Sequence, residues 1–210
     1  MRASKLNGSR IKKVDGKSRF YYDITAESIP VVAPEESPEE RVKMLFEEMR
    51  SSLKSELKEK IWAIEKPFAF ELLVNQLISE MGYGESESTP QSRDGGIDGN
   101  VYEDKLHLRK ICTQAKLYNV NKKVTAEQIR GFGDSLNGCD GIFVTASDFT
   151  VDAINEGNKV RPSGSRIALI NGDQLVDHMI DHNIGVRVKE QTKAYTLKEV
   201  DEQFFEILQR

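Results

Sequence analysis

Three polar side chains in the middle of the chain have the types and the spacing that phosphodiester chemistry needs. Gln114 and Lys116 lie two positions apart in a stretch of alternating side chains that is typical of a β-strand, so both project from one face. Asp98 lies in a glycine-rich segment at the start of the preceding predicted strand. If these two strands pair as neighbours, a carboxylate, an amide carbonyl and an ammonium group converge on one patch.

Such a patch has the donor set of a divalent-metal site. The Asp98 carboxylate and the Gln114 side-chain carbonyl would be oxygen ligands for Mg²⁺ or Mn²⁺, with the backbone carbonyl of Ala115 as a third ligand. The ion would lower the pKa of a bound water and polarise a phosphate. Lys116 would orient the attacking water or neutralise charge that develops in the transition state. The spacing alone is permissive, because an exposed strand face beside a turn satisfies it equally well.

A further carboxylate comes from a helix that is predicted to begin at Pro67 and to stop at Gly82. Glu71 lies at the border of the apolar face of this helix, where a carboxylate is seldom found without a partner. Its side chain could hold a metal-bound water or bind a second ion.

The elements around these residues predict an α/β fold with a central sheet. Strands are expected over 97–102, 107–116, 141–145, 166–170 and 185–188, and helices over 126–136, 149–157 and 173–182. Strands that alternate with helices indicate a sheet with helices on both faces. This main domain is expected to occupy residues 65–190, followed by a helical tail over 191–210.

The N-terminal part is predicted to consist of two smaller segments. Residues 1–36 contain two extended runs around Asp15-Gly16, a good hairpin turn, and then a proline-containing linker. A connecting helix over 37–64 begins with a capping box formed by Ser37 and Glu40. Its apolar stripe either packs on its own domain or forms a homodimer contact. The stripe consists of Val42, Leu45, Phe46, Met49, Leu53, Leu57 and Ile61.

Charge and composition narrow the functional classes. The net charge is −4, which argues against a nonspecific nucleic-acid binder, yet the segment 105–130 carries seven basic residues and a single acid. Lys122 and Arg130 in this segment are candidate phosphate contacts of a nucleic-acid-binding face, although a solvated surface explains the charges equally well.

Other classes are disfavoured. No apolar run approaches the length of about 20 residues that a membrane span needs. The N-terminus has no apolar signal-peptide core, and the two cysteines form no C-x-x-C pair, so a reducing cytoplasm is expected. The glycine-rich stretches lack the Lys-Ser/Thr of a phosphate-binding loop, so no nucleotide cofactor is expected.

The order and spacing of these residues resemble the Mrr family of restriction endonucleases, which cleave modified DNA and belong to the PD-(D/E)xK nuclease superfamily. The resemblance covers residues 67–188 and is carried by several ordered blocks. These are Phe70-Glu71, Met81-Gly82-Tyr83-Gly84, Asp94 to Gly99, Gln114-Ala115-Lys116, Gly141 to Thr145, Ser147 with Phe149-Thr150, and Ile170 to Leu175.

The resemblance implies a restriction-endonuclease-like mixed sheet flanked by helices and a role for each site residue. Asp98 matches the metal-binding aspartate, Lys116 the catalytic lysine and Glu71 the helix acid. Gln114 stands where most of the superfamily has a carboxylate. Further along, Thr145 and Ser147 match a hydroxyl-rich motif that is expected near the DNA phosphate backbone.

The implied function is metal-dependent hydrolysis of double-stranded DNA, of a restriction type that acts on modified or foreign DNA. A repair or junction-resolving nuclease, an RNase of the same fold and a catalytically weak DNA-binding module remain alternatives. The chain departs from the family at Asp134 and Ala146, where small and hydroxyl residues are usual. The family's usual N-terminal winged-helix domain, which selects DNA, is expected to be missing or reduced to the predicted hairpin over 10–25.

Overall fold

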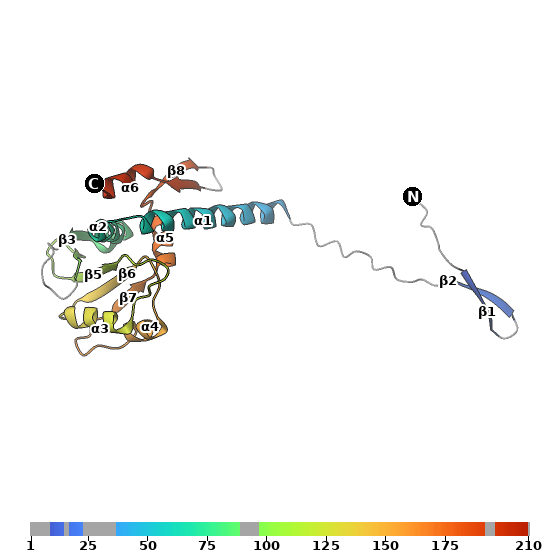
Figure 1. The fold of residues 1–210 in the computed structure, drawn as a ribbon, viewed down its shortest axis with the longest axis horizontal. Coiled ribbons are helices and arrows are strands. Elements are labelled where there is room, and N and C mark those ends of the chain that lie inside the picture. The colour runs from blue at the N-terminus through green and yellow to red at the C-terminus, as the bar shows by residue number, and fades with distance from the viewer. Residues whose placement is uncertain (1–8, 15–16, 23–36, 89–96, 192–195, 210) are drawn as a thin grey trace. The chain divides into compact units, whose positions relative to one another are not determined.

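A five-stranded mixed sheet organises the larger part of the chain in the computed structural model, which describes residues 9–14, 17–22, 37–88, 97–191 and 196–209 (Figure 1). The strand order is β3-β4-β5-β6-β7. The short connection between β4 and β5 makes an antiparallel hairpin, whereas β5, β6 and β7 run parallel because helices connect them. The mixed sheet confirms the predicted fold class. The strands are β3 (Glu85–Ser88), β4 (Gly99–Tyr102), β5 (Lys110–Lys116), β6 (Asp140–Thr145) and β7 (Ile167–Ile170).

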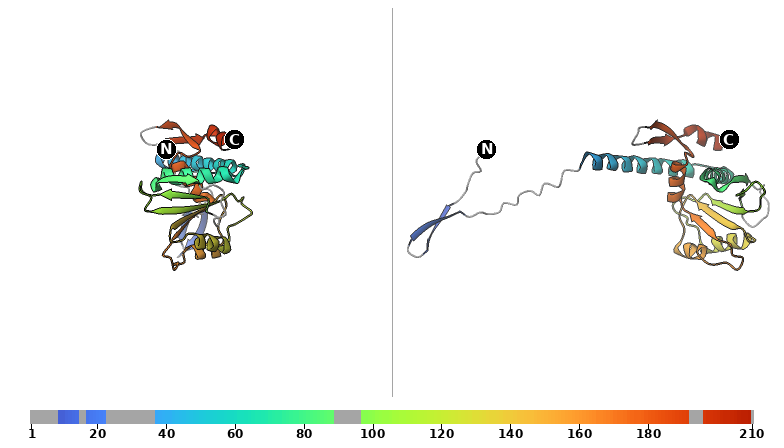
Figure 2. Two further views of the ribbon diagram at one scale, coloured as in Figure 1. Left: turned by 90° about the vertical axis from the view of Figure 1, so that its left-hand side faces the viewer. Right: turned by 180° about the vertical axis from the view of Figure 1, so that it is seen from behind.

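Two apolar clusters cover the two faces of this sheet (Figures 1 and 2). One face packs against α2 (Pro67–Ile78), α5 (Gly172–Asp181) and the last turns of α1 (Pro38–Trp62). The other face packs against α3 (Ala126–Ser135) and α4 (Val151–Gly157). Successive side chains of strand β6 point to opposite faces of the sheet, because Ile142 and Val144 belong to the first cluster and Phe143 belongs to the second. We call these the α2 face and the α3 face.

The chain divides into two units, Met1–Lys43 and Met44–Arg210. In the first unit, β1 (Ser9–Val14) pairs antiparallel with β2 (Lys17–Tyr22), which confirms the predicted hairpin. The turn residues Asp15 and Gly16 and the predicted linker up to residue 36 lie outside the described residues.

The apolar stripe of α1 is buried only at its C-terminal end. Leu57 and Ile61 are fully buried, whereas Leu45 and Met49 are 57% and 49% exposed. The contact with its own domain is therefore confirmed for the C-terminal end, and the homodimer contact stays a prediction. Ion pairs continue the attachment to α5, where Arg50 and Lys54 both reach Asp177.

Two strands were missed by the sequence patterns. Strand β3 has no apolar face and is an edge strand that pairs through its backbone with β4. The strand predicted to close the main domain is β8 (Val186–Gln191), which pairs with β9 (Thr196–Val200) in a separate two-stranded sheet. The tail therefore contains a strand before its helix α6 (Glu202–Leu208). After α2, a short π-helical turn η1 (Ser79–Tyr83) contains Gly82 at φ 86°.

Among the described residues, no helix is long and apolar enough to cross a membrane.

Candidate active site

The β4–β5 hairpin places Asp98 beside Gln114, as the sequence predicts. Gly99 pairs with Thr113 in the antiparallel register, and the backbone N–H of Asp98 donates to the Thr113 carbonyl at 2.8 Å. Continuing this register by one residue sets Asp98 opposite Gln114, and opposite residues of an antiparallel pair point to the same face. That face is the α3 face, since Cys112 two residues earlier on β5 is part of its cluster.

The Asp98 carboxylate is held by the backbone of β5. The N–H of Ala115 donates to Oδ2 of Asp98 at 2.8 Å. Burial raises the pKa of Asp98 above its usual range, against the opposing effects of the Ala115 hydrogen bond and the Lys116 charge. The contact seen for Ala115 is thus made by its N–H group, and the predicted ligand role of its carbonyl stays a prediction.

Glu71 reaches the same place from the other face of the sheet. It lies on α2 and is half-buried. Its pKa is raised first by burial and then by the negative charge of Asp98, while Lys116 opposes the rise. Two carboxylates and one ammonium group therefore lie within electrostatic range at the end of the sheet where β4 begins and β5 ends.

The donor set fits a divalent cation, with one carboxylate fewer than an all-acid site. Among the described residues, no group of three or more histidines, cysteines, aspartates or glutamates could hold a metal ion. The candidate set is instead two carboxylates and the neutral amide of Gln114, a residue that is 7% exposed. Burial is the main cause of the raised pKa values of Glu71 and Asp98 and outweighs the opposing charge of Lys116, so a bound cation would stabilise both ionised carboxylates.

The end of β5 is fixed by the segment that follows β6. The hydroxyl of Thr145 donates to the backbone carbonyl of Lys116 at 2.9 Å, and the N–H of Ala146 donates to the same carbonyl at 3.2 Å. Thr145 is fully buried and Ser147 is 8% exposed, with its Oγ atom buried and without a partner among the described residues. Thr145 thus holds Lys116 in place, and the phosphate contacts expected of both hydroxyls stay a prediction.

Lys122 belongs to a small cluster next to Lys116. Its ammonium group lies 3.9 Å from the centre of the Tyr118 ring, and the Gln128 side chain donates to the Tyr118 hydroxyl at 2.8 Å. Burial acts to raise the pKa of Tyr118, but the Gln128 hydrogen bond and the Lys122 and Lys116 charges outweigh it, so that the pKa is lowered. The cluster therefore holds an exposed ammonium group beside the candidate site.

Arg130 has a structural partner. It lies on α3, and its guanidinium pairs with the Glu156 carboxylate on α4 at 3.3 Å. The Glu156 side chain is 9% exposed and pairs with Lys159 as well. The Arg130 side chain remains 57% exposed, so its contact with nucleic acid stays a prediction.

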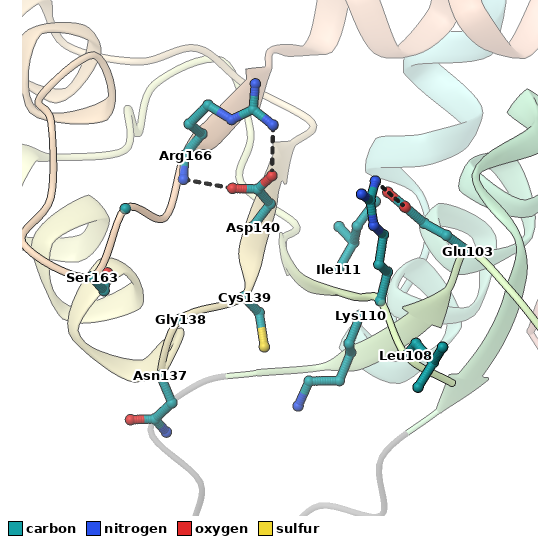
Figure 3. A pocket seen from close by; sticks show the side chains of 12 residues that line it. Glu103, Leu108, Lys110, Ile111, Asn137, Gly138, Cys139, Asp140, Ser163 and Arg166 are labelled. Atoms are coloured by element: carbon teal, nitrogen blue, oxygen red, sulfur yellow. Dashed lines mark hydrogen bonds and ion pairs between the residues drawn. The ribbon is translucent and has the colours of Figure 1, made fainter. Parts of the chain in front are cut away.

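A hollow of about 610 Å³ lies at the opposite end of β5 (Figure 3). It is lined by Lys110 at the start of β5, Asp140 at the start of β6 and Arg166 just before β7, among others. Arg166 donates to Asp140 from both its backbone and its side chain, at 2.8 and 2.9 Å. None of the predicted site residues lines this hollow.

Two residues near the patch were missed by the sequence reasoning. Tyr118 follows Lys116 by two positions, and an aromatic residue before two lysines is a weak but readable signal. Asn75 on α2 lies one turn after Glu71 and is 3% exposed. A single polar residue within the apolar face of α2 was the signal for Asn75.

Comparison with known proteins places this site in a family. The family model described as Mrr_cat, restriction endonuclease, matches residues 64–179, which is more than half of the chain. The chain therefore belongs to the Mrr restriction endonuclease family, and its matched region includes Glu71, Asp98, Gln114 and Lys116.

One relative and two solved structures give the extent of the likeness. The type IV methyl-directed restriction enzyme EcoKMrr of Escherichia coli (strain K12) is 29% identical over 177 residues, covering 81% of this chain and 55% of that enzyme. The DNA modification-dependent restriction endonuclease AspBHI shares the fold, with a TM-score of 0.51 and 22% identity over 63% of this chain and 36% of its own. The MspJI restriction endonuclease in complex with a 27-mer oligonucleotide has a TM-score of 0.47 and 23% identity over 65% of this chain and 33% of its own.

Proposed function

We propose that the chain is a metal-dependent endonuclease that hydrolyses phosphodiester bonds in double-stranded DNA, and that it acts on modified or foreign DNA. The observation that carries the proposal is the convergence of Glu71 on α2, Asp98 just before β4 and Lys116 at the end of β5 on one end of the sheet. Membership of the restriction endonuclease family supports the reaction class.

Each residue has a chemical role in this proposal. Lys116 donates to the scissile phosphate or to the attacking water, and its charge offsets the negative charge that develops on the phosphate. Glu71 accepts a hydrogen bond from the attacking water, which it reaches from the α2 face. Asp98 and Gln114 supply the oxygen ligands of a divalent cation, Mg²⁺ or Mn²⁺. That cation, when bound, supplies a water of lowered pKa and a Lewis acid for the phosphate.

The neutral amide of Gln114 is proposed to couple cation binding to DNA binding. A carboxylate at this position would add a negative charge to the site, whereas Gln114 leaves two carboxylates facing Lys116. The cation should therefore bind more tightly once a DNA phosphate contributes its own oxygen. Titration with Mg²⁺ should show weak binding to the protein alone and stronger binding with duplex DNA. Tight, saturable binding without DNA would contradict this coupling.

The preference for modified DNA is the finest part of the proposal. It is supported by the likeness to a relative whose name describes it as a methyl-directed restriction enzyme, and this chain spans about half the length of that relative. DNA contacts are proposed for the exposed Lys122 and Arg130, whereas Thr145 and Ser147, whose hydroxyls are buried, are proposed to lie near the DNA phosphate backbone. We expect the cytoplasm as the setting.

A panel of plasmids tests both parts. The chain is incubated with Mg²⁺ or Mn²⁺ and with unmethylated, adenine-methylated and cytosine-methylated plasmids, alongside Asp98→Ala and the matched variant Asp140→Ala from the opposite end of the sheet. We expect nicking of a methylated plasmid by the wild type and by Asp140→Ala, and none by Asp98→Ala. Equal cleavage of all plasmids would remove the preference for modified DNA. Absence of nicking on every plasmid would remove the nuclease assignment.

A further inference from the structure

Asn75 is a polar side chain in the apolar face of α2. It is 3% exposed and packs among buried residues of that helix. The Thr113 hydroxyl donates to its Oδ1 at 2.9 Å. Its Nδ2 is buried and has no hydrogen-bond partner among the residues that the structure describes. An unpaired buried amide lowers stability, so its presence requires an explanation other than packing.

The Asn75 amide lies directly against Gly99. A methyl group at Gly99 would lie 2.6 Å from both Oδ1 and Nδ2 of Asn75, and 2.8 Å from the Thr113 hydroxyl. Such distances are too short for any real side chain, so α2 can approach β4 this closely only because residue 99 is glycine. The amide therefore fills the space beside the backbone that carries Asp98.

This contact joins the three elements of the site. Glu71 lies one turn before Asn75 on α2, Asp98 directly precedes Gly99, and Thr113 lies on β5. The backbone N–H of Asp98 also donates to the Thr113 carbonyl at 2.8 Å. The position of the Asn75 amide therefore sets how far α2 stands from the β4–β5 hairpin, and with it the separation of the two carboxylates.

We propose that Asn75 is a positioning residue of the active site, whose amide locks α2 against Gly99 and Thr113 so that Glu71 and Asp98 share one substrate. The inference rests on the proposed nuclease function and adds to it a residue that touches neither DNA nor cation. A leucine of similar shape would remove the unpaired Nδ2 but would leave the buried Thr113 hydroxyl without its acceptor, so the two effects on stability offset each other and stability alone does not account for the asparagine. Positioning accounts for it, because only the amide oxygen can accept from Thr113.

The test compares the full chain with Asn75→Leu and with Ser79→Ala. Ser79 is a matched control because its Oγ is also buried without a partner, one turn further along from Asn75. We expect Asn75→Leu to melt close to the wild-type temperature, because the loss of the unpaired Nδ2 offsets the Thr113 hydroxyl left without its acceptor, but to lower kcat for plasmid nicking about 10- to 100-fold, with KM for DNA unchanged. Hydrogen exchange at the Asp98 amide should be faster. Ser79→Ala should nick as the wild type does.

A second pair of variants decides the matter if Asn75→Leu does not fold. Thr113→Val removes the hydroxyl that Asn75 accepts from, and Thr113→Ser keeps it. We expect nicking to fall in Thr113→Val and to be retained in Thr113→Ser.

The outcomes separate the inference from the function on which it rests. Wild-type kcat in Asn75→Leu, an equal loss in Ser79→Ala, or equal nicking by the two Thr113 variants would overturn the inference alone. Absence of nicking by the wild type on every plasmid would overturn the proposed function and this inference with it.

Discussion

The aspartates beside the two ends of strand β5 have pKa values shifted in opposite directions. We call the end that begins at Lys110 the pocket end and the end at Lys116 the site end. At the pocket end, Asp140 is matched by Arg166, whose hydrogen bond to the carboxylate holds the pKa of Asp140 below its usual range. At the site end, burial holds the pKa of Asp98 above its usual range, and Lys116 compensates it only in part. This difference is the one expected if Asp140 serves the fold and Asp98 has the proposed role in the site, because carboxylates whose pKa is raised by burial are common at functional sites.

The largest expected effect comes from replacing the lysine at each end of β5 by methionine. Lys116→Met removes the positively charged ammonium group that acts on Asp98 and Glu71, so we expect plasmid nicking to fall about 10²- to 10³-fold. Lys110→Met makes the same change in the first residue of β5, and nicking should be unchanged. Initial rates on supercoiled plasmid measure both variants. A similar loss in both would mean that β5 responds to any change of charge.

The next test measures stability through the two aspartates. Asp98 has a raised pKa, so its ionised form is disfavoured in the folded state at neutral pH. Asp98→Asn should therefore raise the melting temperature at neutral pH, and the gain should vanish as the pH falls below the usual aspartate pKa of about 3.9. The variant should also lose nicking activity, because the amide cannot replace the charge.

Asp140→Asn should behave in the opposite way. Its lowered pKa stabilises the fold above the usual aspartate pKa, and this contribution is lost as the pH falls through the folded value. The variant should melt lower than the wild type at neutral pH, with the difference closing in acid and nicking retained. Thermal melts from neutral to acidic pH provide the measurement. Two shifts of the same sign would contradict the contrast between the two ends.

The smallest expected effect concerns DNA affinity. Lys122 is exposed and held over the Tyr118 ring, so it can meet one phosphate without reorganisation. Lys122→Ala should weaken DNA binding a fewfold and lower the slope of log K against log salt by about 1, which is the loss of one phosphate contact. Lys110→Ala should leave the slope as it is. Binding measured in Ca²⁺ over a salt series makes the comparison, and equal slopes for all three proteins would exclude Lys122 as a phosphate contact.

The sequence alone predicted those features that follow from the two-residue repeat of side chains along a β-strand. Alternation in β5 predicted that Gln114 and Lys116 share a face, and the hairpin register agrees with the placement of Asp98 beside them. Glu71 was predicted as the helix acid of the site from the family resemblance, whereas the residue pattern alone showed only that it lies at the border of a buried face. Its approach to Asp98 from the α2 side depends on the missing side chain of Gly99, which no local pattern shows.

Other features depended on contacts between distant residues. The burial of Thr145 follows from its bond to the Lys116 carbonyl, and a hydroxyl at a strand end could equally have been exposed. Strand β3 carries no apolar alternation, so only its pairing with β4 reveals it. For the same reason β9 became visible only through its partner β8.

The metal dependence of nicking tests the central claim most directly. A methylated plasmid is incubated with the wild type and with Asp98→Ala, first in EDTA and then with Mg²⁺ or Mn²⁺ restored in excess. If Asp98 and Gln114 hold a catalytic cation at the site end of β5, EDTA should abolish nicking and the restored ion should recover it in the wild type alone. Nicking that persists in EDTA, or that recovers equally in Asp98→Ala, would contradict this account.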